Sequence, residues 1–310
     1  MTENLPTLAS MSDALATAVE QAGRQIVSVN ARRRGPATGV EWKSGVIVTA
    51  DHIIERDEAI TLTTPDGATH QVTVIGRDPS TDLAVLSVSG WSSEQTWTAR
   101  TEIRPGQLVL AVGRSGDAGL GVSFGALSSA GPEFRTHGGG KIDRYLRPDV
   151  TFYPGFSGGP LIDVGGSLLG INTSGLAHGL PLTVPFATVD RVVDQLLTSG
   201  RVSRGYLGLR MQAVDLGAEL AAKHRLESSE GLLVVGVETD GPGAGSGILV
   251  GDAIIALGGR SVAEADGVQS MLDAESVGKN VILRVIRGGD LRDVAVTVGE
   301  RPTRRKSRRG

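Results

Sequence analysis

The chain contains the residue types that hydrolysis of an amide bond requires, and each occurs in a suitable local setting. Such a reaction needs a nucleophile, a base to take its proton, a group to orient the base, and donors for the oxyanion. Ser157 is the candidate nucleophile, within the run Gly155-Phe156-Ser157-Gly158-Gly159. Glycines allow sharp backbone turns that aim neighbouring N–H groups into one cavity. We therefore expect the N–H groups of Gly155 and Ser157 to form an oxyanion hole.

Candidates for the base and its orienting group lie at the ends of two apolar runs. His52 follows a run that ends at Ala50, and Asp82 directly precedes the run Leu83 to Val88. Strand ends are rigid mounts for catalytic groups. Singly, each residue is more typical of a structural role: a surface histidine, an aspartate in a turn, a serine between glycines. Together, the order His, Asp, Ser is that of the chymotrypsin-type triad and differs from the subtilisin and α/β-hydrolase orders.

The elements that must position these residues are short strands separated by Gly, Asp, Ser and Pro. Evenly spaced strands of this kind are typical of antiparallel barrels. A helix from Ser12, as N-cap, to Gly23 is predicted before them, and a second helix from Thr188 to about Leu197, which ends at Gly200, after them. The stretch Ala31 to Gly39 has the composition of an exposed loop. The predicted strands are 25–30, 45–49, 59–63, 71–75, 83–88, 108–112, 122–127 and 168–172.

A change of pattern at residues 200–205 predicts a domain boundary. Beyond it we expect strands 231–237, 253–257, 281–286 and 292–298, a turn at 240–247, and a helix from Ala263 to Ala274, which together form one small module. The predicted parts are therefore an N-terminal helical segment (1–24), an all-β domain (25–200), a small α+β domain (201–300) and a basic disordered tail (301–310).

Composition and charge exclude several classes of protein. Hydrophobic residues make up 40% of the 310 residues and charged residues 21%, as in a soluble globular protein. The net charge of the chain is −3, and six of the last ten residues are cationic, so residues 1–300 alone have a net charge of −9. This acidic body argues against nucleic-acid binding. Cysteine is absent, which excludes thiolate chemistry, and no remaining histidine has the spacing of a metal ligand.

The sequence contains no signal peptide and no apolar run of 18 residues. As written, it therefore predicts a cytoplasmic protein without a membrane segment. An upstream segment would instead place the protein in the periplasm or at a membrane.

Four motifs in order resemble those of the HtrA (Deg) family of trypsin-like serine proteases. They are Ser44-Gly45-Val46-Ile47-Val48-Thr49 before His52, Asp78-Pro79-x-x-Asp82-Leu83-Ala84-Val85-Leu86, Gly155-x-Ser157-Gly158-Gly159-Pro160-Leu161, and Gly170-Ile171-Asn172-Thr173. The resemblance covers roughly residues 10–300, and the triad separations of 30 and 75 residues are similar to those of the family's barrels.

The resemblance implies two six-stranded β-barrels with the triad in the cleft between them. Ser157 would be the nucleophile, His52 the general acid and base, and Asp82 the group that orients His52. No metal, nucleotide or other cofactor is implied. The family resemblance further implies a homotrimer built partly by the N-terminal segment, and an ATP-independent role in quality control of unfolded proteins.

Two positions bear on how this chain differs from the family or from trypsin. Phe156 stands where the family usually has a small polar asparagine, which predicts a differently packed or switchable oxyanion loop. Thr151, six residues before the nucleophile, is not acidic, which argues against cleavage after Arg or Lys. We expect a preference for small aliphatic residues in a pocket formed by Thr151, Asn172, Thr173 and Ser174.

The second domain resembles a PDZ domain of the HtrA type. The run Arg204-Gly205-Tyr206-Leu207-Gly208-Leu209 is similar to the loop that binds a peptide's terminal carboxylate, where glycine lets successive N–H groups face that carboxylate. The later helix offers side chains for the peptide, which are equally consistent with core packing. The expected peptide-binding residues are Tyr206, Leu207, Gly208, Leu209, Val268, Met271 and Leu272.

Two other functions use the same residues. A proteolytically latent chaperone or peptide-binding adaptor would keep the triad but have a distorted oxyanion loop. An esterase or acyl transferase would use the same triad, although barrels and a PDZ module suit extended polypeptides.

Overall fold

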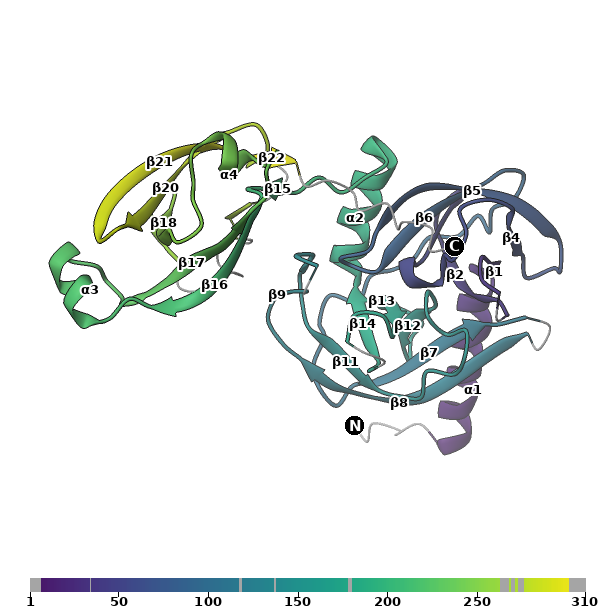
Figure 1. Cartoon of the computed structure of the whole chain (residues 1–310). Coiled ribbons are helices and arrows are strands. Elements are labelled where there is room, and N and C mark those ends of the chain that lie inside the picture. The colour runs from purple at the N-terminus through teal and green to yellow at the C-terminus, as the bar shows by residue number, and fades with distance from the viewer. Residues whose placement is uncertain are drawn as a thin grey trace. The chain divides into compact units, whose positions relative to one another are not determined.

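The computed structural model divides into two units, residues 1–202 and 203–310, each with its own sheets (Figure 1). It describes residues 7–33, 35–116, 119–136, 138–177, 180–262, 268, 271–272 and 276–300. The expected tail at 301–310 lies outside the described residues, as does most of the expected helix at 263–274. Among the described residues, no helix is long and apolar enough to cross a membrane.

The first unit contains a closed barrel and a second six-stranded sheet, which confirms the predicted all-β class. The barrel has the strand order β1 (Ile26–Asn30), β2 (Ala37–Lys43), β3 (Val46–Ala50), β6 (Leu83–Val88), β5 (Thr69–Asp78) and β4 (Ile60–Thr63). The second sheet has the order β11 (Leu146–Asp149), β8 (Leu120–Ala130), β7 (Leu108–Arg114), β12 (Pro160–Asp163), β13 (Leu168–Thr173) and β14 (Leu182–Pro185). Its end strands β11 and β14 lie side by side, so the sheet nearly closes.

Strand alternation explains how two cores share the same strands. Along β6, Ala84 and Leu86 fill the first barrel, whereas Leu83 and Val85 join a cluster that also includes residues of β7, β13 and α2. Successive side chains of a strand point to opposite faces, so a strand with both faces buried is apolar throughout. This shared cluster therefore joins the two barrels, and it includes Leu83, the residue that follows Asp82.

The remaining elements of the first unit are two helices, a short 3₁₀ turn and a hairpin. The 3₁₀ turn η1 (Asp51–Ile53) follows β3, and β9 (Phe134–Arg135) pairs with β10 (Lys141–Ile142). Helix α1 (Leu8–Gly23) precedes the barrels and α2 (Phe186–Ser199) follows them. Gly200 ends α2 in the left-handed region at φ 70°, as predicted.

Three predicted element starts are wrong for local reasons. Helix α1 begins at Leu8 rather than after Ser12, because the Thr7 hydroxyl accepts a hydrogen bond from the Ser10 N–H and caps the helix. Helix α2 begins at Phe186, and the side chain of Thr188 instead bonds Asp143. The stretch predicted as loop 31–39 enters strand β2 at Ala37, since the Arg32 guanidinium closes the turn on the carbonyls of Gly35 and Pro36.

In its described residues, the second unit contains a six-stranded antiparallel sheet, a two-stranded sheet and short helices. Its order is β16 (Leu209–Asp215), β17 (Glu230–Val237), β18 (Ala253–Leu257), β20 (Asn280–Arg287) and β21 (Asp290–Thr297), with β19 (Arg260–Ser261) on β18. Strand β15 (Gly205–Tyr206) pairs with β22 (Gly299–Glu300), and α3 (Ala218–His224) was not predicted. Helix α4 (Pro242–Gly245) occupies part of the predicted turn at 240–247, with Pro242 at its first turn.

Candidate active site

His52 lies on the 3₁₀ turn that follows β3, and Arg77 holds this turn in place. The Arg77 guanidinium donates to the Asp51 carboxylate at 2.5 Å, to the carbonyls of Asp51 and Ile54 at 3.2 and 3.0 Å, and to Asp57 at 2.8 Å. Burial by itself would lower the pKa of Arg77, but its hydrogen bonds and charge interactions with Asp51 and Asp57 outweigh burial and raise it. A permanent cation thus fixes the backbone on both sides of His52.

Asp82 is buried and receives three hydrogen bonds on its carboxylate. Its Oδ2 lies 2.7 Å from His52 Nδ1, and its Oδ1 accepts from the His52 backbone N–H at 2.8 Å. The Thr173 hydroxyl also donates to Oδ2. Because a carboxylate accepts hydrogen bonds, His52 Nδ1 is the donor in the 2.7 Å contact, which leaves Nε2 as the ring nitrogen available to take a proton. The arrangement prepares Nε2 to act as a base.

Ser157 is buried in the turn before β12, and its loop rests on the strands that lead to His52. A Cβ at Gly158 would collide with the Thr38 carbonyl and the Thr49 hydroxyl and would lie 3.1 Å from the Ala50 nitrogen. Glycine is therefore required there, in a backbone with φ 88°. The close approach places Gly158, the residue after the predicted nucleophile, against Thr49 and Ala50, and Ala50 is two residues before His52.

The segment 173–175 connects Ser157 to the His52–Asp82 pair. Ser174 Oγ lies 3.2 Å from Ser157 Oγ, while the adjacent Thr173 bonds Asp82. A Cβ at Gly175 would lie 2.6 Å from Asp82 Oδ2 and 2.7 Å from His52 Nδ1. Among the described residues, Ser174 is the only side-chain hydrogen-bond partner of Ser157. The three predicted catalytic residues thus surround one short segment.

The two N–H groups predicted to form the oxyanion hole belong to residues on either side of Phe156. Within the described part of the chain, neither the Gly155 N–H nor the Ser157 N–H donates to a protein acceptor. The Phe156 N–H donates to the Tyr153 carbonyl at 3.0 Å, which closes a turn with Gly155 at φ 92°, as a type II turn requires. The Thr38 hydroxyl donates to the Gly155 carbonyl at 2.6 Å and so fixes the following peptide.

Four residues were expected to form a specificity pocket, and the structure gives them different settings. Thr151 is exposed, and Ser174 is half-buried beside Ser157. Asn172 is fully buried, with its amide bonded to the Pro160 carbonyl and the Thr183 hydroxyl. Thr173 bonds Asp82. Asn172 and Thr173 therefore use their polar groups within the protein, whereas Thr151 and Ser174 remain accessible.

Two further residues of this site, Thr38 and Gly175, were not predicted from the sequence. Thr38 is fully buried. Its hydroxyl donates to the Gly155 carbonyl and accepts a hydrogen bond from the Arg114 N–H at 2.9 Å, and its backbone N–H donates to the Ser157 carbonyl at 3.4 Å. It had been predicted within a loop. Gly175 lies two residues after the Gly170–Thr173 motif, and that proximity was the available signal.

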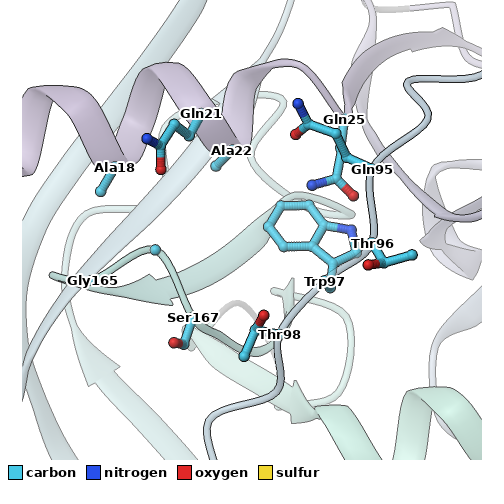
Figure 2. A pocket seen from close by; sticks show the side chains of 11 residues that line it. Ala18, Gln21, Ala22, Gln25, Gln95, Thr96, Trp97, Thr98, Gly165 and Ser167 are labelled. Atoms are coloured by element: carbon cyan, nitrogen blue, oxygen red, sulfur yellow. The ribbon is translucent and has the colours of Figure 1, made fainter.

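A pocket of about 240 Å³ in the first unit lies at a different place from these residues. Figure 2 shows it between α1, the segment 95–98 and the turn at 165–167. Helix α1 contributes Ala18, Gln21 and Ala22, and Trp97 lies across from them. None of the predicted catalytic residues lines this pocket.

In the second unit, the predicted peptide-binding loop leads into a strand at the edge of the sheet. Strand β16 pairs with β17 on one side only among the described residues. The carbonyls of Leu207 and Gly208 accept hydrogen bonds from Gly243 and Glu238 at 2.8 Å, and Gly208 has φ 70°. In the part that the structure describes, the N–H groups of Leu207 and Gly208 donate to no acceptor.

The side chains expected to line the peptide pocket divide into core and accessible residues. Val268 is fully buried, and Leu207 and Leu272 are 3% and 7% exposed within the same core cluster. Tyr206, Leu209 and Met271 are partly exposed. Of the two interpretations open for the helix residues, core packing describes Val268 and Leu272, whereas Met271 retains accessible surface.

Comparison with known proteins gives concordant matches for both units. A family model described as a trypsin-like peptidase domain matches residues 37–171, and a model described as a PDZ domain matches residues 205–298. A probable periplasmic serine endoprotease, DegP-like, of Brucella suis is 32% identical over 268 residues, which cover 84% of this chain and 51% of that protein. A protein of the same description from Halomonas elongata is 32% identical and covers 86% of this chain and 57% of its own length. The chain spans about half the length of the curated relatives it matches.

Solved structures match over nearly the whole chain. The HtrA-type protease AlgW with decapeptide has a TM-score of 0.76 at 26% identity and covers 94% of this chain and 99% of its own. The serine endoprotease from Yersinia pestis has a TM-score of 0.74 at 27% identity, over 96% of this chain and all of its own.

Proposed function

Because this chain belongs to the HtrA family of trypsin-like serine proteases with a PDZ domain, we propose that it is an endopeptidase that cleaves unfolded or misfolded polypeptides without ATP. The observation that carries the proposal is the pair formed by His52 Nδ1 and Asp82 Oδ2 at 2.7 Å, with Ser157 next to the segment that supports the pair.

The proposed reaction follows from this geometry. Rotation of the Ser157 side chain from Ser174 towards His52 Nε2 allows the imidazole to take the hydroxyl proton as Oγ attacks the scissile carbonyl. Asp82 stabilises the imidazolium. The N–H groups of Gly155 and Ser157 hold the oxyanion, His52 then protonates the leaving amine, and water hydrolyses the acyl-enzyme.

Covalent labelling and proteolysis test this function together. We expect a fluorophosphonate to label wild-type protein at Ser157, and wild-type protein to degrade unfolded casein in the absence of ATP. Ser157→Ala should abolish both. Equal degradation by the two proteins would contradict the assignment. No degradation by either, with retained peptide binding, would favour the latent adaptor.

We also propose that the enzyme prefers small aliphatic residues at the cleaved position. The support is that Thr151 and Ser174, the two accessible residues of the expected pocket, are small and uncharged. Cleavage of a peptide library mainly after Arg or Lys would contradict this preference.

The second unit is proposed to bind peptide C-termini at the edge of β16. The N–H groups of Leu207 and Gly208, which have no acceptor in the described part of the chain, suit a terminal carboxylate. The edge of β16 suits an added peptide strand, and the accessible Met271 suits an apolar side chain. A fluorescent peptide with a free carboxylate should bind at least about tenfold more tightly than its amidated form. Equal affinities would exclude recognition of the carboxylate. Labelling of Ser157 with and without the peptide distinguishes regulation from substrate capture.

Self-association as a homotrimer is proposed to involve α1. Residues 7–14 are all exposed, and they include Leu8 at 83% and Met11 at 37% exposure. Sedimentation velocity should give a trimer for the wild type and a smaller species for Leu8→Glu/Met11→Glu. A monomeric wild type would contradict the proposal.

A further inference from the structure

Phe156, between the two predicted oxyanion donors, is inserted into the second barrel. Its side chain is 3% exposed and belongs to the cluster that fills this barrel, together with Val109, Leu127 and Leu161. Tyr153 covers the ring edge-on, with ring centroids 5.3 Å apart. The residue next to the nucleophile is therefore buried by apolar contacts on a β-sheet rather than held by polar groups.

The sheet has a notch that matches this ring. Gly113 of β7 and Gly121 of β8 are directly paired across the two strands. A Cβ at Gly113 would lie 2.6 Å from Phe156 Cδ1, and one at Gly121 would lie 3.1 Å from Phe156 Cε1. Side chains at either position would occupy the space of the ring. The two paired glycines thus leave the space that the Phe156 ring occupies, and this space over Gly113 and Gly121 is the seat of the ring.

The backbone on both sides of Phe156 is fixed by hydrogen bonds. The Phe156 N–H donates to Tyr153 and its carbonyl accepts from the Gly159 N–H, both at 3.0 Å. The Gly155 carbonyl is held by Thr38. The Phe156 Cα is bonded directly to the peptide that carries the Ser157 N–H. On its other side, the Gly155–Phe156 peptide, held at its carbonyl and at the Phe156 N–H, leads to the peptide that carries the Gly155 N–H. Insertion of the ring therefore limits rotation of the first donor peptide directly and of the second through Gly155. Among the described residues, the Gly155 and Ser157 N–H groups donate to no acceptor of the protein.

We propose that Phe156 is the positioning residue of the oxyanion hole, and that its ring, seated over the Gly113–Gly121 pair, holds the two flanking N–H groups in their reactive orientation. The inference rests on the proposed proteolytic function. Phe156 does not touch the reacting atoms; it acts through the peptides of Gly155 and Ser157. An oxyanion hole contributes by preorganised donors, so a loosened loop loses rate without losing substrate affinity.

Peptide hydrolysis by Phe156→Leu and Phe156→Ala tests the proposal against Leu127→Ala, a matched change in the same core. We expect kcat to fall about tenfold in Phe156→Leu and about 10²-fold in Phe156→Ala, with KM within about twofold. Affinity for a peptide aldehyde, whose hemiacetal oxygen occupies the oxyanion hole, should fall in parallel. Leu127→Ala should lower the melting temperature comparably to Phe156→Ala and leave kcat near the wild-type value.

A size-swap pair provides a second line of evidence. Gly113→Ala alone should reduce kcat, because its methyl group displaces the ring. Phe156→Leu shortens the side chain and makes room for that methyl. The double variant Gly113→Ala/Phe156→Leu should therefore lose less activity than the product of the single losses. A loss of activity in the double variant equal to the product of the two single losses would mean that Gly113 and Phe156 do not share one space.

Hydrogen exchange separates this inference from the proposed function. Amides of residues 155–159 should exchange at least about tenfold faster in Phe156→Leu than in wild type and remain unchanged in Leu127→Ala. If the wild-type protein neither hydrolyses peptides nor is labelled, the proposed function is overturned. The exchange rates of residues 155–159 would still test whether the Phe156 ring holds the loop. An active wild type with equal kcat and equal exchange in Phe156→Leu would overturn the role of Phe156.

Discussion

The proposed nucleophile, Ser157, is hydrogen-bonded to Ser174, which neither gives nor takes a proton in the proposed reaction. Ser157 Oγ lies 3.2 Å from Ser174 Oγ, whereas His52 is the residue proposed to take the Ser157 proton. A net hydrogen bond of this kind contributes about 0.5–1.5 kcal/mol. Breaking it before attack adds that amount to the barrier, so Ser174 is a restraint on the resting nucleophile.

Ser174→Ala should therefore accelerate labelling of Ser157 by a fluorophosphonate, by about two- to tenfold. The pseudo-first-order rate constant at fixed reagent concentration measures this effect. Ser128→Ala removes an exposed hydroxyl whose side-chain hydrogen bond, among the described residues, goes to the Arg147 carbonyl, and it should leave the rate unchanged. Slower labelling of Ser174→Ala would mean that Ser174 assists the reaction.

At the scale of elements, one carboxylate joins the connection between β10 and β11 to helix α2. Asp143 accepts from the Thr188 hydroxyl at 2.7 Å and from Arg191 at 2.8 Å, and its N–H donates to Thr188. Burial raises the pKa of Asp143, but hydrogen bonds from Thr188 and Arg191, with the charges of Arg191 and Lys141, outweigh burial and lower it below its usual value.

Asp143→Asn should reduce the free energy of unfolding at pH 7 by about 1–2 kcal/mol. A carboxyl whose pKa is lower in the folded state stabilises the fold at pH values above its unfolded pKa of about 3.9, and this contribution is lost as pH falls through the folded value. The difference between the two proteins should therefore shrink below about pH 4. Urea unfolding from pH 7 to pH 3.5 measures it; a difference independent of pH would exclude the charge as its cause.

At the scale of the whole molecule, each unit buries a hydrophobic core of its own. In the second unit, Leu283 of β20 is fully buried among Leu232, Val234 and Val296. In the first unit, the two barrels and their shared cluster hold separate sets of residues. Loss of one core contact should therefore act on the unit that contains it.

Leu283→Ala should lower the stability of the second unit by about 2–5 kcal/mol, since the cavity left by a buried leucine is only partly filled. Calorimetry should show this as a shift of one transition, with labelling of Ser157 unchanged at 25 °C. Leu127→Ala in the first unit is the reciprocal control. An equal shift of all transitions by either variant would contradict independent cores.

The sequence alone determined the order of the candidate triad residues, the glycine run around Ser157 and most strands, because these depend on near neighbours. Runs such as Leu83–Val88 are apolar since both faces of the strand are buried, and this pattern is readable without coordinates. Element starts were less predictable: one hydrogen bond to Thr7 and two from Arg32 moved them by several residues.

Only the tertiary structure decided which distant residues meet. Thr173 was expected in a substrate pocket, yet its hydroxyl bonds Asp82, 91 residues away. Phe156 was noted as unusual, but its seat depends on two glycines that become neighbours through the register of β7 and β8. Such contacts follow from strand pairing and from which face each side chain takes, and a one-residue change of register would reverse them. Local sequence does not contain that information, because it arises only when the strands are paired.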